Sequence, residues 1–279
     1  MMGGMFRSLV CWAVAGLLLL APARPLAQVD LHATFDKILD TYVRDGYVYY
    51  LALQKERGAL DRYVSSLDVP RARVDAWPKA DQEAFWVNAY NAVVLATVIG
   101  GYPIKVRSSE FPAKSIRQIP GAFETTRHRV AGEAMTLDEI EKNVIVKFGD
   151  GRLLLALGRG AIGSGRLRSE AFQGAQLDRQ LTDVTRECAS RVACVKIDRA
   201  AGVMEVSPLF GWRQDAFAVT GDASSERWAN RSPLERAVTA LVYPFVFPSE
   251  RQFLELNTFR MTYGTFDWRL NDLTGGVPN

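Results

Sequence analysis

The chain has 279 residues, of which 48% are hydrophobic and 23% charged, and this composition is typical of a globular protein with one large or two small domains. The formal net charge is +3, and residues 1–27 contribute two arginines and no acid, so the rest of the chain is near 3 − 2 = +1. So weak a charge gives no electrostatic case for binding nucleic acid.

The first 27 residues have the pattern of a secretory signal peptide. Arg7 precedes the apolar run Leu9–Leu20, and small residues follow at Ala21, Ala23 and Ala27. Cleavage after Ala27 or after Ala23 fits this pattern, and we favour Ala27; the alternative is an uncleaved N-terminal anchor. No second long apolar run follows, so we expect an exported soluble protein, periplasmic or secreted, without a membrane span after signal removal.

The cysteines agree with export. Cys11 leaves with the signal peptide, and Cys188 and Cys194 remain as an even pair in an oxidising compartment. We expect a disulfide between them, worth roughly 2 kcal/mol for so short a loop. The alternative is two unconnected buried thiols, and the spacing is not that of a C-x-x-C redox site.

Apolar spacing, capping residues and turn signals predict the elements in chain order. An amphipathic helix begins at residue 31, an extended segment follows at 45–50, and a second helix covers about 60–67. A central helix runs from about 79 to 99, followed by an irregular stretch at 101–127. The remaining predictions are a hairpin at 129–135, a capped helix at 136–148, a buried strand at 153–157, a helix at 177–188, a hairpin at 192–207 and helices near 233–243 and 249–256.

The central helix is the most informative segment. The stretch Ala84–Ile99 is apolar on nearly every side, which predicts a helix enclosed by other elements, with Trp86 as a structural core residue. Its sixteen residues are too few for a comfortable membrane span. Asn88 and Asn91 project from one side of this helix, and since an unpaired buried amide costs about 1–3 kcal/mol, we expect both to bond a neighbouring backbone such as the Gly158–Gly165 turn.

Short strands among longer helices, without regular alternation, predict an α+β fold. We expect a helix-rich single domain over residues 28–279, with a buried central helix and a small antiparallel sheet.

The segment Gly158–Gly163 matches G-x-G-x-x-G, but the second strand and acidic residue of a dinucleotide site are missing, so no nucleotide cofactor is expected. A milder interpretation is that the glycines free backbone N–H groups to cradle an anion, with Arg159, Arg166 and Arg168 as ligand-binding residues. The alternative is a tight turn with a solvated basic face.

Ser164 lies between two glycines and is a candidate nucleophile, although the motif is not G-x-S-x-G. Its base would be Lys142 or His128, with Glu141 nearby. Glu141 is also expected to form a structural ion pair, for which Arg159 is the candidate partner. The chain has only two histidines, His32 and His128, so no metal site is expected.

Six segments resemble, in order, the motifs of the domain of unknown function 547 family. They cover almost the whole mature chain, and the segment F-W-V-N-A-Y-N-A at 85–92 is the most specific. In chain order, the segments are Asp45–Tyr50, Phe85–Ala92, Ser115–Ile119, Leu137–Glu141, Val206–Trp212 with Asp215 and Phe217, and Tyr263–Asp272.

The family pattern includes a histidine and two cysteines that look like the material of a thiol hydrolase. In this chain the cysteines align with Arg159 and Ser164, and the histidine aligns with Lys142. The resemblance therefore implies the family fold, while arginine cannot supply a thiolate nucleophile.

Three functions follow as hypotheses. The first is a non-catalytic or catalytically degenerate domain that binds a protein partner or a small anionic ligand at the Gly158–Arg168 turn. The second is a hydrolase that uses Ser164 with Lys142 or His128 as base, and the third is a structural or assembly component.

Overall fold

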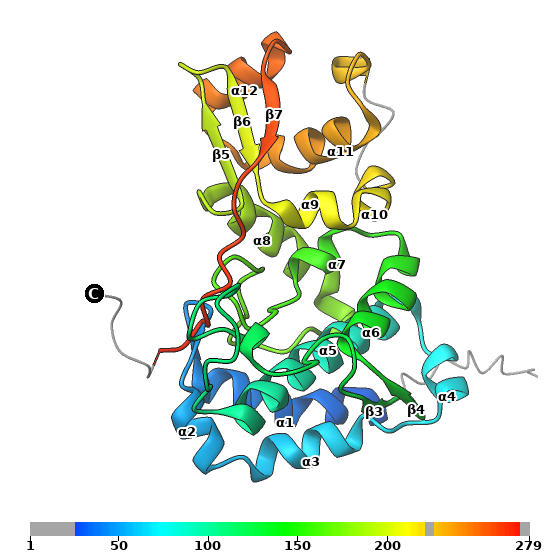
Figure 1. The fold of residues 1–279 in the computed structure, drawn as a ribbon. Coiled ribbons are helices and arrows are strands. Elements are labelled where there is room, and N and C mark those ends of the chain that lie inside the picture. Colours follow the sequence, from blue (N-terminus) through cyan, green and yellow to red (C-terminus); the bar gives the residue numbers. More distant parts are fainter. Residues whose placement is uncertain (1–25, 221–225, 274–279) are drawn as a thin grey trace, which may run out of the picture.

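The computed structural model describes residues 26–220 and 226–273 (Figure 1). The predicted signal peptide, residues 1–27, lies outside the described residues except for its last two positions. The first helix, α1, spans Leu26–Tyr42.

The central helix α5 spans Lys79–Gly101 and lies at the heart of the helical part of the molecule (Figure 1). It packs against α1, α2 (Tyr50–Lys55), α3 (Gly58–Ser66) and α6 (Leu137–Asn143). All side chains from Glu83 to Leu95 are buried, including Trp86. Helix α5 is long and apolar enough to cross a membrane, but 83% of its most apolar window is buried inside the protein, as expected of a core helix.

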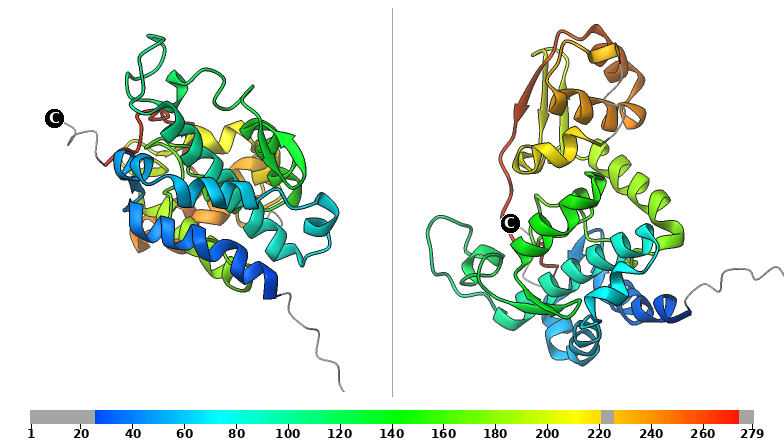
Figure 2. Two further views of the ribbon diagram at one scale, coloured as in Figure 1. Left: turned by 90° about the horizontal axis from the view of Figure 1, so that it is seen from below. Right: turned by 90° about the vertical axis from the view of Figure 1, so that its right-hand side faces the viewer.

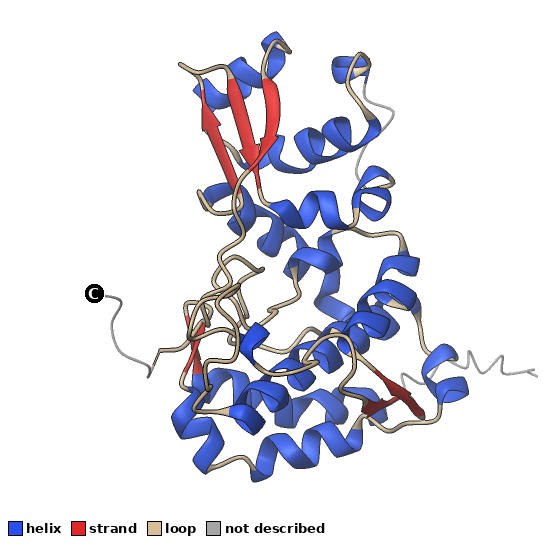
Figure 3. Ribbon diagram, viewed as in Figure 1, coloured by secondary structure: helices blue, strands red, loops and turns tan. Residues whose placement is uncertain are grey.

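The second part of the molecule holds a three-stranded sheet of β5 (Val195–Asp198), β6 (Val203–Val206) and β7 (Arg260–Tyr263), shown in red at one end of Figure 3. The pair β5–β6 is the predicted antiparallel hairpin, whereas β7 joins β6 in parallel. Helix α8 (Leu177–Ser190) connects this part to the helical part. The molecule is therefore a helix-rich α+β protein, as predicted.

The predicted hairpin at 129–135 forms strands β3 and β4, and Thr136 caps α6 in a capping box with Glu139. The apolar run at 153–157, predicted as a strand, instead begins as a short helix, α7 (Arg152–Leu155). A leucine run without polar positions has no periodicity that separates a buried strand from a buried helix. The remaining elements are β1 (Val43–Arg44), β2 (Tyr47–Val48), α4 (Arg71–Asp75), β3 (His128–Val130), β4 (Glu133–Met135), α9 (Pro208–Trp212), α10 (Gln214–Ala218), α11 (Pro233–Val242), α12 (Pro248–Leu256) and the 3-10 helices Ile116–Gln118, Ile145–Phe148, Gly174–Gln176, Glu226–Trp228 and Tyr243–Phe245.

The segment after β7 joins the two parts of the molecule. It leaves the sheet and runs back to the helical part, as the red chain in the right-hand view of Figure 2 shows. There Leu270 forms a β-bridge with Ala161, and Asp272 forms one with Val48. The described part of this segment therefore lies against the glycine-rich turn.

Cys188 and Cys194 form a disulfide between the end of α8 and the start of β5. The bond closes a short loop that carries Arg191. The backbone of Arg191 is held inside this loop, because its N–H donates to Cys188 and its carbonyl accepts from Cys194.

Candidate functional site

Two asparagines of α5 fix the backbone on either side of the glycine-rich turn. Asn91 donates to the carbonyl of Ala156 over 3.1 Å and accepts from the N–H of Gly158 over 2.8 Å. Asn88 makes the same pair of bonds with the backbone of Phe172. Each amide satisfies one donor and one acceptor that would otherwise be buried without a partner.

Three successive N–H groups of the turn are already bonded and are not free for an anion. The N–H of Ile162 donates to Arg269, that of Gly163 donates to Asp267, and that of Ser164 donates to Ala161. The prediction that these glycines free backbone donors for an anion is therefore not supported at these positions.

The glycines instead allow close packing. A Cβ atom at Gly165 would lie 1.7 Å from the carbonyl oxygen of Leu155, and one at Gly163 would lie 2.6 Å from the nitrogen of Asp267. Residues with side chains do not fit at such distances. Gly163, the last glycine of the motif, is therefore required by contact with the C-terminal segment, and Gly165, just after the motif, by contact with α7. Gly160 adopts a φ of +66°, which favours glycine.

Arg159 is buried in an ion pair with Glu141. Its Nη2 lies 2.9 Å from the Glu141 carboxylate, and its Nη1 donates to the carbonyls of Leu154 and Leu157. Burial by itself lowers the pKa of Arg159, but the Glu141 charge raises it above the ordinary arginine value. Arg159 is therefore held inside the fold rather than presented to a ligand.

Glu141 also serves a second arginine. Its Oε1 lies 2.9 Å from Nε of Arg213, at ion-pair distance, although that N–H is not aligned as a hydrogen bond. The hydroxyl of Tyr90 donates to the same carboxylate over 3.5 Å. Two guanidinium groups thus share one carboxylate, which leaves one positive charge in excess.

The three candidate catalytic residues do not come together. The hydroxyl of Ser164 is buried and donates to the carbonyl of Ala161, and Lys142 pairs with Asp138 on the surface of α6. Among the described residues, no hydrogen bond or ion pair joins any two of Ser164, Lys142 and Glu141.

Neither histidine forms a hydrogen bond or ion pair with Ser164 among the described residues. His32 lies beside Tyr63, with 2.8 Å between Nδ1 and the phenol oxygen, and His128 is in strand β3. Over the described part of the chain, no group of three or more His, Cys, Asp and Glu side chains could hold a metal ion.

The other two predicted ligand-binding arginines have acidic partners. Arg168 pairs with Glu170, and Arg166 pairs with Glu187 over 3.0 Å. Arg166 also lies 3.9 Å from Asp45, whose side chain is 87% exposed.

A small polar pocket lies beside the turn, and we call it the turn pocket. Its volume is about 110 Å³. Three distant segments that carry family-like motifs meet there: the β1–β2 hairpin, the turn, and the C-terminal segment through Asn271. The lining residues are Asp45, Gly46, Tyr47, Ala161, Ile162, Ser164, Gly165, Arg166, Arg191 and Asn271.

Arg191 is the lining residue that the sequence analysis missed. Its guanidinium donates to the carbonyls of Ser164 and Ile162 over 3.2 and 3.0 Å. Within the described residues it forms no ion pair. Burial and then the charge of Arg166 lower its pKa. Its position between Cys188 and Cys194 is the one sequence signal that its backbone is held in place, by the disulfide loop.

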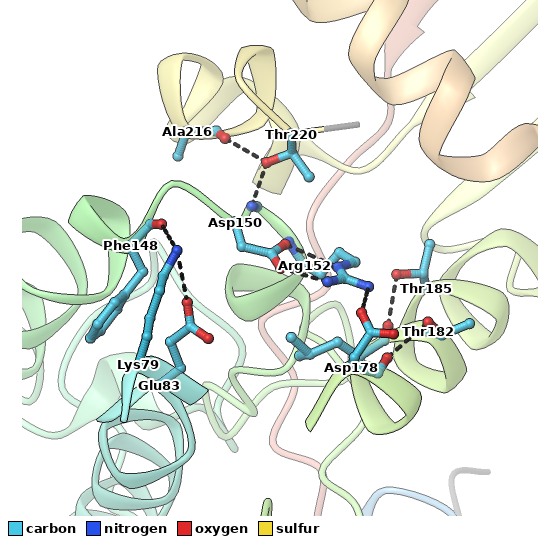
Figure 4. Close-up of polar contacts among 12 residues, drawn as sticks. Lys79, Glu83, Phe148, Asp150, Arg152, Asp178, Thr182, Thr185, Ala216 and Thr220 are labelled. Atoms are coloured by element: carbon cyan, nitrogen blue, oxygen red, sulfur yellow. Dashed lines mark hydrogen bonds and ion pairs between the residues drawn. The ribbon is translucent and has the colours of Figure 1, made fainter. Parts of the chain in front are cut away.

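A larger pocket of about 510 Å³, here the threonine pocket, lies between the two parts of the molecule (Figure 4). Its lining includes Lys79, Arg152, Thr182, Thr185 and Thr220. The charged groups are already paired: Lys79 lies 3.6 Å from Glu83, and Arg152 pairs with Asp150 and Asp178. The threonine hydroxyls each donate to a backbone carbonyl four residues earlier. Arg152 serves two carboxylates, so one negative charge is in excess, but it belongs to Asp178, whose side chain is 87% exposed and does not line the pocket. The residues that line the pocket therefore do not select a ligand class.

Comparison with known proteins gives one match. Residues 74–188, which contain α5, α6, α7, the glycine-rich turn and most of α8, match the family model described as "Protein of unknown function, DUF547". The motif-like segments at 45–50, 206–217 and 263–272 lie outside the matched range. Searches of curated proteins and of solved structures found no match.

Proposed function

Since the chain belongs to the DUF547 family, whose description names no activity, we propose its function from its own site. It is an exported, non-catalytic domain that binds a small anion in the turn pocket. Export is supported by the signal-like sequence of residues 1–27 and by the disulfide.

The observation that carries the proposal is the state of Arg191. It borders the pocket, forms no ion pair among the described residues, and lies near a second cation, Arg166. An anion between the two guanidinium groups removes their repulsion and receives charge-assisted hydrogen bonds. Two carboxylates oppose an anion here: Asp45, whose side chain is 87% exposed, lies 3.9 Å from Arg166, and Glu187 pairs with Arg166 over 3.0 Å. Arg191, which has no ion pair among the described residues, therefore supplies most of the attraction for the anion.

The size of the pocket defines the class of ligand. Pockets for drug-sized molecules have volumes of roughly 300–1,000 Å³, and about 110 Å³ is much smaller. The ligand is therefore an inorganic oxyanion, or the terminal phosphate, sulfate or carboxylate of a larger molecule.

A non-catalytic role agrees with the residues that this chain has where the family pattern has a cysteine and a histidine. Arg159 and Lys142 are both committed to ion pairs. The alternative, a hydrolase that uses Ser164, lacks a base hydrogen-bonded to the serine among the described residues. A fluorophosphonate probe should leave Ser164 unlabelled in folded protein, and labelling there would support the hydrolase.

The test is an anion-dependent rise in melting temperature. Phosphate and chloride are compared at equal ionic strength, so that screening is the same in both. Because kosmotropic anions also stabilise proteins without a site, the site-specific effect is the part of the rise that the variants below lose. Phosphate at about ten times its dissociation constant should raise the melting temperature of the wild type by about 3 °C. Arg191→Gln and Arg166→Gln should lose this rise.

Arg168→Gln is the matched control, since Arg168 pairs with Glu170 and does not line the pocket. It should keep the full phosphate effect. Equal phosphate effects in wild type, Arg191→Gln and Arg168→Gln would contradict the proposal, since they would show that stabilisation does not pass through the turn pocket.

A further inference from the structure

Five aromatic side chains gather where α9 meets the C-terminal segment. We call this set, with Arg117 and Arg213, the aromatic patch; its aromatic members are Phe111, Phe123, Trp212, Phe266 and Trp268. The indoles of Trp212 and Trp268 are nearly parallel, at 16°, with centroids 5.9 Å apart. Trp212 is 40% exposed. A large aromatic side chain this exposed leaves ring surface available to a ligand.

Arginines flank these rings. The guanidinium carbon of Arg117 lies 4.6 Å from the ring centre of Trp268 and 4.6 Å from that of Phe123. Its Nε is buried without a hydrogen-bond partner, and the same holds for Nε of Arg213. Arg213 follows Trp212 directly in the chain and donates to its carbonyl.

The patch carries an unbalanced positive charge. Arg117 has its own partner, Glu124, but Arg213 shares Glu141 with the buried Arg159. One carboxylate therefore serves two guanidinium groups, and the second of these, Arg213, is only partly buried. A ligand carboxylate completes this set of charges.

We propose that the aromatic patch binds an acidic saccharide, with a sugar ring stacked on Trp212 and a uronate carboxylate at Arg213. A pyranose ring presents an apolar C–H face that an indole covers, and its carboxylate matches the fork of a guanidinium group. The site is separate from the turn pocket and does not depend on the function proposed for it.

The charge distribution favours a saccharide over a single-stranded nucleic acid. A nucleic acid places a phosphate on every nucleotide and needs a basic groove along its backbone. The aromatic patch has one excess positive charge, and the chain without residues 1–27 is near 3 − 2 = +1. A short acidic saccharide needs no such groove, because one uronate carboxylate at Arg213 and one ring face on Trp212 suffice to hold it.

The test is a titration of the purified full chain with trigalacturonate, followed by tryptophan fluorescence and calorimetry. Maltotriose serves as the neutral saccharide and a ten-residue oligothymidylate as the nucleic acid. We expect saturable binding of trigalacturonate, with maltotriose weaker by about tenfold or more. Trp212→Ala and Arg213→Gln should each weaken trigalacturonate binding by about tenfold.

Two variants control for the residue types. Phe247→Ala removes an aromatic side chain that is 74% exposed, and Arg179→Gln removes an exposed arginine paired with Asp183. Both should bind trigalacturonate within about twofold of wild type. Arg191→Gln should also bind it normally, which separates this site from the turn pocket.

Several results overturn the proposal. They are no saturable binding of trigalacturonate, equal affinity for maltotriose, tighter binding of oligothymidylate, or unchanged affinity in both Trp212→Ala and Arg213→Gln. Circular dichroism shows whether each variant is folded, and Arg213→Gln decides the result if Trp212→Ala is not.

Discussion

At the scale of single residues, the carboxylate of Glu141 is the most consequential buried charge. It is the shared partner of Arg159 and Arg213 and accepts a bond from Tyr90. Its neighbour Lys142 makes an exposed ion pair with Asp138. Substitutions at these two adjacent residues of α6 therefore allow a buried ion pair to be compared with an exposed one.

Glu141→Gln should lower the free energy of unfolding by about 3 kcal/mol, because it leaves two guanidinium groups without their carboxylate. Lys142→Gln should cost less than about 1 kcal/mol, since exposed pairs contribute little. Urea denaturation measures both values. Similar losses for the two variants would mean that Glu141 is not the electrostatic centre of this cluster.

His32 makes the fold sensitive to acid. Burial lowers its pKa from 6.5 to about 4, and Nε2 is buried without a partner. A lowered pKa means that the unfolded chain binds the proton more readily than the folded one. The stability linked to His32 is therefore complete above pH 6.5 and is lost as the pH falls toward 4.

His32→Phe should remove this component of acid sensitivity. Between pH 7 and pH 4.5 the wild type should lose roughly 2–3 kcal/mol more unfolding free energy than the variant. His128, whose pKa is also lowered by burial, is present in both proteins and cancels in the difference. Parallel pH profiles of urea-derived stability would argue against a buried neutral His32.

At the scale of elements, helix α5 was predictable because its pattern is local. An apolar run with proline before it and a Gly-Gly-x-Pro sequence after it specifies a buried helix without knowledge of the rest of the chain. The partners of Asn88 and Asn91 are not local, since they lie more than sixty residues away. The apolar pattern around these amides predicted that each must form a hydrogen bond, but it could not identify which backbone groups are the partners.

Asn91→Leu should destabilise the protein by about 3 kcal/mol, because it leaves the carbonyl of Ala156 and the N–H of Gly158 without partners. For a chain of this size the melting temperature should fall by at least about 5 °C. Asn143→Leu, at the exposed end of α6, is the control and should change it by less than about 2 °C. Equal melting temperatures for Asn91→Leu and wild type would remove the role given to this amide.

The disulfide loop between α8 and β5 couples stability to the turn pocket. Arg191 lies inside this loop, and both its N–H and its carbonyl bond to the loop backbone. The cysteine spacing suggests a closed loop, but it does not say which pocket the enclosed arginine reaches.

Replacement of both Cys188 and Cys194 by serine should cost about 2 kcal/mol of unfolding free energy. It should also reduce the phosphate-dependent rise in melting temperature, because Arg191 loses its fixed position. Thermal melts of the double variant with and without phosphate measure both effects. A full phosphate effect in the double variant would show that the loop does not position Arg191.

At the scale of the whole molecule, the sequence predicted most helices, two hairpins and the α+β class, but not how distant segments meet. Strand β7 was missed because it is only four residues long and pairs with β6, more than fifty residues earlier in the chain, rather than with a neighbour in a hairpin. The return of the C-terminal segment over the glycine-rich turn depends on pairs such as Leu270 with Ala161, more than a hundred residues apart. Such pairing is decided by packing of the whole chain rather than by local preference.

The candidate sites also combine residues that local sequence can indicate with residues that only the tertiary structure brings together. Arg159, Ser164 and Arg166 were selected from local spacing, and the structure distributes them between a buried ion pair and the turn pocket. Arg191, Arg213 and Trp268 come from other segments and gain meaning only through contacts across the fold. Sequence spacing can nominate the residues of one loop, but a site built from three segments requires the tertiary structure.

The central claim is that an anion binds between Arg166 and Arg191, and a crystal grown with selenate tests it most directly. The anomalous map of the wild type should show a selenium peak in the turn pocket, with oxygens about 3 Å from both guanidinium groups. The Arg191→Gln crystal should lack that peak. A wild-type turn pocket without selenium, in crystals that bind selenate elsewhere, would contradict the account.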